Sequence, residues 1–167
     1  MVEMKSYEPS LKELLQKEIY ALPFGECVVN ILDLFQNDPT QGSVCGCFGF
    51  SESGKPVVDF YTKSIENEWN QTKNRIIKRY SSKEKWIQMM VRHEYRHYQQ
   101  YQYFESIYEG YYEYVFNLEQ DFKYGEGPLE QDARDFSYGM DNDLAQLAAK
   151  YPNPMASRKK EVKKGRM

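Results

Sequence analysis

The first helical pattern of apolar residues begins near residue 11. Ser10 and Glu13 form a capping box, in which a hydroxyl and a carboxylate satisfy backbone N–H groups at the start of a helix. Pro23 and Gly25 are residues that end helices. The pattern therefore predicts a helix from residue 11 to about residue 22. Its apolar face consists of Leu11, Leu14, Leu15, Ile19 and Leu22.

Between residues 26 and 61 the apolar residues form three short runs, at 27–35, 44–50 and 56–61. The sequence Asn37-Asp38-Pro39 separates the first two runs, and Glu52-Ser53-Gly54 separates the last two. Short apolar runs divided by turn residues are typical of an antiparallel meander. We expect a small antiparallel sheet of about three strands, although the first run is also compatible with a helix.

Helical spacing returns after Thr62 and continues to about Tyr80, with Ile65, Trp69 and Ile76 on one face. A second capping box, from Ser81 to Glu84, then predicts the start of a long helix. Six residues recur along this helix at intervals of three or four, which places them on an inward stripe. They are Trp86, Met90, His93, His97, Tyr101 and Phe104.

The rest of the chain is rich in tyrosine up to residue 114 and is interrupted by glycine. Gly110 is expected to permit a close approach or a kink within a second long helix. A loop at 124–128 follows, and Pro128 suits the first turn of a final helix that runs toward Lys150. These elements predict an α+β fold with one domain over residues 1–151. Residues 152–167 are expected to form a flexible basic tail.

Composition indicates a globular, soluble and cytoplasmic protein. Tyr and Phe make up 24 of the 167 residues and supply much apolar area for a core. No segment approaches the roughly 20 apolar residues that span a bilayer, and Met1 to Glu8 lack the pattern of a secretory signal. Three cysteines are too few for a disulfide scaffold. Cys45 and Cys47 would share one face of a strand, where packing is favoured over metal binding.

The charge is unevenly distributed. Six basic residues and one glutamate after Pro152 give the tail a charge of +5. Because the net charge of the chain is −3, the rest of the chain carries about −8. An acidic body disfavours a large phosphate-binding face, and therefore a nucleic-acid partner. The basic tail leaves a contact with nucleic acid or with an acidic partner as the alternative.

The chain has two histidines, and they stand four residues apart as His93 and His97 with Glu94 between them. A helix places residues i and i+4 on one face, so both imidazoles can reach a single zinc ion while Glu94 flanks its bound water. Inward-facing imidazoles without a metal would need other hydrogen-bond partners. The motif predicts a zinc site of the metallopeptidase type.

A catalytic zinc usually has three protein ligands and an open fourth position. Because both histidines are already used, the third ligand must be a carboxylate or a cysteine. Glu130, at the start of the helix predicted from Pro128, is the best candidate. Asp132 and Glu126 remain alternatives.

The two motifs together resemble the ImmA/IrrE type of zinc metallopeptidases, within the gluzincin group. The shared residues are His93-Glu94-x-x-His97 and, downstream, Glu130-x-x-Ala-x-x-Phe-Ser. The resemblance implies a minimal zincin-like fold in which His93, His97 and Glu130 bind zinc and Glu94 is the catalytic base. It covers about half of the chain. Arg134 stands where the family commonly has asparagine, and no DNA-binding helix-turn-helix is visible.

The expected function is therefore hydrolysis of peptide bonds in a peptide or protein substrate, with zinc as the cofactor. By analogy, the hairpin of residues 43–62 would bind an extended peptide along an edge strand. Tyr124, Tyr138 and Arg96 are near the motifs and are candidates for stabilising the oxyanion. Two alternatives are a metal-binding interaction or regulatory protein, of a phage or mobile element for example, and a chain whose histidines bind nothing. The sequence leaves the oligomeric state open.

Overall fold

The computed structural model describes residues 8–39, 42–123 and 125–151. The chain divides into two compact units, residues 1–98 and 99–167, and the boundary falls inside one long helix. The described residues form helices and two small sheets, so the predicted α+β class is confirmed. The predicted basic tail, residues 152–167, lies outside the described residues.

The first unit begins with helix α1, Leu11–Tyr20. As predicted, Ser10 caps it, because the Ser10 hydroxyl accepts a hydrogen bond of 3.2 Å from the backbone N–H of Glu13. Leu11, Leu14 and Leu15 are buried, which confirms the apolar face. The helix ends two residues earlier than expected, with Ala21 as its C-cap.

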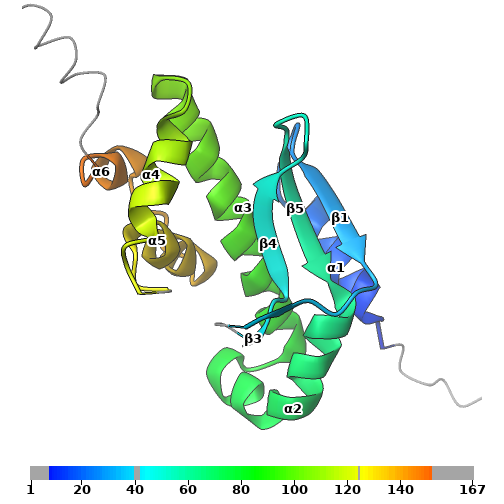
Figure 1. Ribbon diagram of the computed structural model, residues 1–167. Coiled ribbons are helices and arrows are strands. Elements are labelled where there is room, and N and C mark those ends of the chain that lie inside the picture. The colour runs from blue at the N-terminus through cyan, green and yellow to red at the C-terminus, as the bar shows by residue number, and fades with distance from the viewer. Residues whose placement is uncertain (1–7, 40–41, 124, 152–167) are drawn as a thin grey trace, which may run out of the picture. The chain divides into compact units, whose positions relative to one another are not determined.

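Three strands form the main sheet of the first unit: β1 (Val28–Leu32), β4 (Gly46–Phe50) and β5 (Pro56–Tyr61) (Figure 1). Their order is β1-β5-β4, with β4 antiparallel and β1 parallel to β5. The expectation of a purely antiparallel meander was therefore wrong, because the sheet is mixed. Val58 and Phe60 of β5 are fully buried, which explains why the last strand in sequence takes the central position. Two short strands, β2 (Asn37–Asp38) and β3 (Gly42–Ser43), pair separately.

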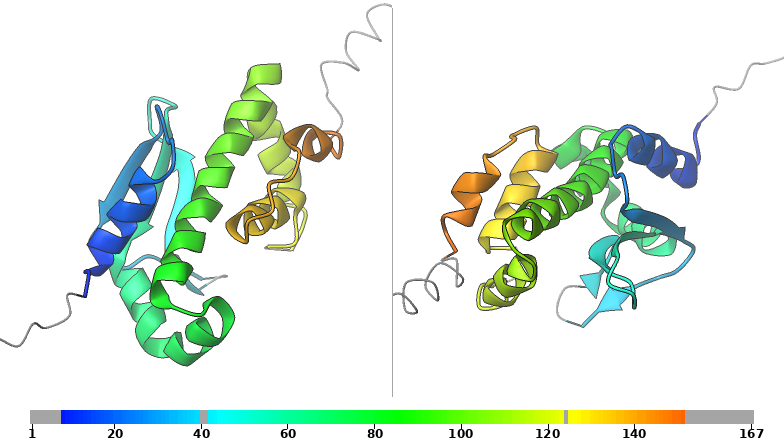
Figure 2. Two further views of the ribbon diagram at one scale, coloured as in Figure 1. Left: turned by 180° about the vertical axis from the view of Figure 1, so that it is seen from behind. Right: turned by 90° about the horizontal axis from the view of Figure 1, so that it is seen from above.

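Helix α2, Thr62–Tyr80, follows β5 directly, and helix α3, Lys83–Ile107, follows after a short turn. Both helices were predicted, but the cap of α3 is Ser82 and not Ser81. The Ser82 hydroxyl accepts a hydrogen bond of 3.1 Å from the backbone N–H of Lys85. Ser81 instead ends α2 with a φ of 77°. In the first unit, α1 and α3 lie on the same side of the sheet (Figure 2).

The second unit contains the end of α3, then α4 (Tyr111–Glu119), α5 (Pro128–Ser137) and α6 (Leu144–Ala148). Gly110, with a φ of 88°, precedes α4 as its N-cap, so the tyrosine-rich segment forms two helices and not one kinked helix. Pro128 occupies the first turn of α5, as predicted. The final helix does not continue to Lys150, because Gly139 adopts a φ of 99° and α6 begins anew after Asp143.

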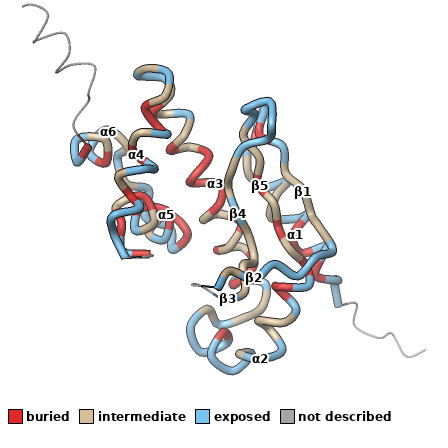
Figure 3. Tube along the Cα trace, in the orientation of Figure 1, coloured by how far each residue is buried: buried red, intermediate tan, exposed pale blue. Residues whose placement is uncertain are grey.

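Buried residues line α3 along most of its length and recur on α5 (Figure 3). In the second unit, Phe104, Val115 and Ala133 are fully buried. Within the described residues, no helix has both the length and the apolarity needed to cross a bilayer.

Candidate metal centre

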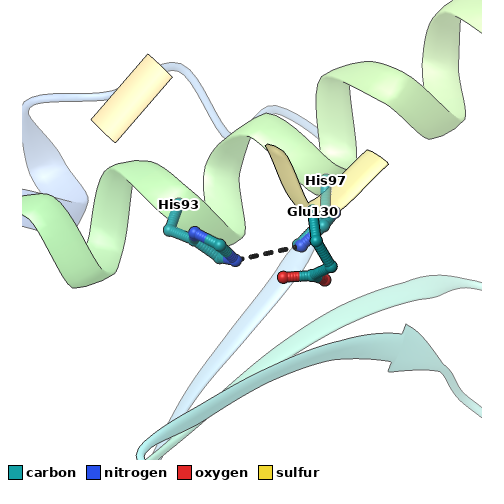
Figure 4. A group of neighbouring side chains, drawn as sticks. All are labelled: His93, His97 and Glu130. Carbon is teal, nitrogen blue, oxygen red and sulfur yellow. Dashed lines mark hydrogen bonds between the residues drawn. The ribbon is translucent and has the colours of Figure 1, made fainter. Parts of the chain in front are cut away.

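The two histidines lie one helical turn apart on α3, with His97 buried and His93 partly exposed. Their Nε2 atoms are 3.2 Å apart, and their rings meet edge to face with centroids 4.9 Å apart (Figure 4). Two nitrogen ligands of a tetrahedral zinc with ordinary Zn–N bonds would be separated by about 3.3 Å. The imidazoles therefore already have the spacing that a shared metal ion requires.

Glu130 joins the histidines from the first turn of α5. One ligand atom from each of His93, His97 and Glu130 lies within 4.8 Å of the other two, and Figure 4 shows the carboxylate beside the imidazole nitrogens. In the described part of the chain, these residues are the group of histidine, cysteine and acidic side chains placed to hold a metal ion. The group could bind a metal ion, and its mixed nitrogen and oxygen donors fit zinc.

The two rival third ligands lie outside this group. Asp132 is buried, and its carboxylate accepts hydrogen bonds from the side-chain amides of Gln100 at 2.8 Å and Asn142 at 3.3 Å. Glu126 is exposed in the turn before α5. Of the three carboxylates that the sequence offered, the structure therefore brings Glu130 to the histidines.

Gln100 links α5 to the helix that carries the histidines. It lies three residues after His97 on α3 and is fully buried. Its side-chain amide donates hydrogen bonds to the Leu129 carbonyl at 3.0 Å and to the Asp132 carboxylate at 2.8 Å. Because Leu129 immediately precedes Glu130, Gln100 fixes the first turn of α5 against α3. The spacing of the histidine motif in the sequence did not indicate this role of Gln100.

Glu94, the expected base, is buried and lies against strand β4. A Cβ atom added to Gly46 would stand 3.3 Å from the Glu94 Cγ and 3.1 Å from the Phe60 ring. The strand can approach Glu94 this closely only because residue 46 has no side chain. Sequence reasoning missed Gly46, although a glycine inside a strand is the signal that marks such an approach.

Aromatic rings of β4 flank the second histidine. The Phe48 ring stacks beside His97 with centroids 6.5 Å apart and planes inclined by 20°, and it also contacts Phe50 and Tyr98. Side chains two residues apart on a strand share a face, so Gly46 and Phe48 both face α3. This face of β4 therefore provides the wall beside Glu94 and His97.

Two of the three candidates for oxyanion stabilisation, Arg96 and Tyr138, lie within the described residues and differ in their environments. Arg96 is almost fully buried on α3. Tyr138 follows α5 and is half exposed, and Tyr124 lies outside the described residues.

The cysteines do not belong to the metal-binding group. The expectation that Cys45 and Cys47 serve in packing was wrong for Cys47, which is exposed on the face of β4 opposite Phe48. Cys45 is half-buried, and burial, with Glu68 and Glu94 nearby, raises the pKa of its thiol to about 12. Burial likewise raises the pKa of Cys27 to about 11.

Comparison of the chain with protein-family models, with curated proteins and with solved structures finds no match. Two imidazoles and a carboxylate can hold a metal ion, and a second carboxylate stands between the imidazoles in sequence.

Proposed function

We propose that this protein is a zinc-dependent metallopeptidase, with His93, His97 and Glu130 as zinc ligands and Glu94 as general base. The observation that carries the proposal is the 3.2 Å spacing of the two Nε2 atoms together with a carboxylate from another helix. The resemblance of the two motifs to ImmA/IrrE-type metallopeptidases supports the same activity.

The ligand set fits catalysis better than a purely structural zinc site. Structural zinc sites usually have four protein ligands, often cysteines, whereas catalytic sites have three and keep one position open. The group here supplies three ligands and no cysteine. When bound, zinc would acidify a water molecule and polarise the carbonyl oxygen of a substrate.

In this proposal, Glu94 would handle the proton. It adjoins His93 on α3, and Gly46 of strand β4 lies close to its side chain. An Oε atom of Glu94 would take a proton from the attacking water and then deliver it to the nitrogen of the leaving amine. The arrangement lets one carboxylate act first as base and then as acid.

Strand β4 would receive the substrate. It stands at the end of the sheet order β1-β5-β4, and its residues Gly46 and Phe48 lie beside Glu94 and His97. An extended peptide added along an edge strand obtains main-chain hydrogen bonds without a deep pocket. A peptide or protein substrate is therefore proposed. The free cysteines Cys27, Cys45 and Cys47 agree with action in the reducing cytoplasm.

The first test measures zinc. Protein purified without chelator should contain close to one zinc per chain, whereas His93→Ala and His97→Ala should lose it and Glu130→Ala should bind it more weakly. Glu126→Gln, which changes an exposed carboxylate outside the group, is the matched control and should keep the metal. Less than about 0.2 zinc per chain, with no uptake on titration, would remove the zinc hypothesis.

The second test separates an enzyme from a metal-binding interaction protein. The zinc-loaded protein should cleave members of a peptide library, and Glu94→Gln should bind zinc normally yet lose cleavage, because it keeps the shape of the side chain and removes the base. Equal cleavage by both proteins would refute the role of Glu94. Zinc binding without any cleavage would favour the interaction protein.

A further inference from the structure

Glu119, the last residue of α4, is a buried carboxylate with both oxygens engaged. Its Oε1 accepts hydrogen bonds from the backbone N–H groups of Leu129 at 2.8 Å and Glu130 at 3.3 Å. Its Oε2 accepts a hydrogen bond from the Tyr151 hydroxyl. We propose that Glu119 is a positioning residue that holds the Glu130 ligand in place, an inference that rests on the proposed zinc site.

The start of α5 needs a cap from elsewhere. The first N–H groups of a helix have no partner within the helix, and the N-cap of α5 is Gly127, which has no side chain to offer. The Glu119 carboxylate supplies the missing acceptor from α4, and its negative charge suits the positive end of the α5 dipole. The hydrogen-bonded turn is the one that carries Glu130, so the cap fixes the backbone of the ligand itself.

Gly127 gives independent evidence that this contact shapes the site. A Cβ atom at residue 127 would lie 1.9 Å from the Glu119 Oε1 and 2.2 Å from its Cδ, so a side chain there would force the Glu119 carboxylate to move. The φ of Gly127 is −70°, a value open to every residue, so its backbone conformation does not require glycine. The space that a side chain would fill is occupied by the carboxylate.

Tyr151 restrains the second oxygen of the carboxylate. Burial and the hydrogen bond to Glu119 raise the pKa of the Tyr151 hydroxyl well above its ordinary value, so it remains a protonated donor. The backbone carbonyl of Tyr151 in turn accepts a hydrogen bond of 2.9 Å from the Tyr111 hydroxyl. With amide donors on one oxygen and a fixed phenol on the other, the Glu119 carboxylate cannot rotate away from α5.

The test measures zinc affinity by chelator competition and the absorption spectrum of the cobalt(II) form, which reports coordination geometry. Glu119→Gln and Gly127→Ala should each weaken zinc binding about 10–100-fold, the usual effect of losing an outer hydrogen-bond partner, and should alter the cobalt spectrum. Tyr151→Phe should have a smaller effect in the same direction, because it frees only one oxygen. Circular dichroism would verify that each variant is folded.

Val115→Ala is the matched control. It removes buried apolar packing from α4, the helix that carries Glu119, but leaves the hydrogen bonds of Glu119 intact. Its zinc affinity and cobalt spectrum should equal those of the parent protein, although its thermal stability should fall. If Val115→Ala loses as much affinity as Glu119→Gln, the effect is one of general stability and the positioning role is overturned.

Two other results would overturn the inference and differ in what they say about the zinc site. If Glu130→Ala weakens zinc binding while Glu119→Gln and Gly127→Ala bind as tightly as the parent, the zinc site stands and the positioning role fails. If the parent protein binds no zinc, both the proposed function and the positioning role of Glu119 are refuted. Amide exchange would then identify Glu119 as a helix cap only, through faster exchange at Leu129 and Glu130 in Glu119→Gln.

Discussion

Replacing Gly46 with alanine tests how tightly strand β4 is packed against the proposed base. The added Cβ would meet two atoms of the Phe60 ring at 3.1 and 3.2 Å and the Glu94 Cγ at 3.3 Å. Ordinary van der Waals contacts between carbon atoms lie at about 3.5–4.0 Å. Phe60 is fully buried on the central strand and pairs directly with Gly46, so its ring has no room to withdraw.

The expected loss of stability combines two opposing effects. Overpacking a well-packed site costs about 1–3 kcal/mol. Replacing glycine with alanine also restricts the unfolded chain, which stabilises the folded state by about 0.4–1 kcal/mol. Gly46→Ala should therefore lower the free energy of unfolding by about 0–2.6 kcal/mol.

Gly49→Ala is a matched control on the same strand, because a Cβ at that position would have no atom within 4 Å. This variant retains only the effect on the unfolded chain, so the two variants should differ by about 1–3 kcal/mol. With a urea m-value of about 2 kcal/mol/M, the midpoints of unfolding should differ by about 0.5–1.5 M.

Tryptophan fluorescence is suited to this measurement. The two tryptophans of the chain, Trp69 and Trp86, belong to the same unit as Gly46, and their rings stack with centroids 6.0 Å apart. Urea unfolding followed by fluorescence therefore reports the unit that the substitution perturbs. Equal midpoints for Gly46→Ala and Gly49→Ala would refute the close packing of β4 against Phe60 and Glu94.

Three further predictions concern the cap of α3, the thiols and the metal. Ser82→Ala should cost about 1 kcal/mol in urea unfolding, and no change would contradict the observed cap. Iodoacetamide at pH 8 should modify the exposed Cys47 first. The pKa values of Cys27 and Cys45 are raised to about 11 and 12, so the thiolate fractions and alkylation rates of these two residues should increase as the pH rises well above 8. Equal labelling of the three cysteines at pH 8, measured by mass spectrometry, would refute this order. Zinc at about 100 times its Kd should add about 2.7 kcal/mol of stability, and an unfolding curve that is insensitive to both zinc and chelator would argue against a metal site.

Much of the local structure could be predicted from sequence because it depends on residues close together in the chain. The Ser10 cap acts over three residues, and the His93 and His97 rings meet because a helix repeats every 3.6 residues. The errors occurred where two local interpretations compete. Ser81 and Ser82 both suit an N-cap, and the chain selects Ser82 because Ser81 ends the preceding helix with a positive φ.

Sheet order and the choice among carboxylates required the tertiary structure. The sequence offers three strand-forming runs, but only the burial of Val58 and Phe60 decides that β5 is central and that β1 joins it in parallel. Glu126, Glu130 and Asp132 each offer a carboxylate that could serve as the third metal ligand. Their difference lies in what surrounds them, since Asp132 is engaged by Gln100 and Glu126 is exposed.

The sequence by itself determined the two imidazoles, the carboxylate between them and the helix that carries them, because a motif within five residues is fixed by helical geometry. Only the tertiary structure decided that Glu130 meets the histidines, that Gly46 lets β4 approach Glu94 and that Gly127 makes room for Glu119. Neither Gly46 nor Gly127 has a positive φ, so no local conformational requirement marks them in the sequence. Their importance comes from side chains distant in the chain that occupy the space beside them.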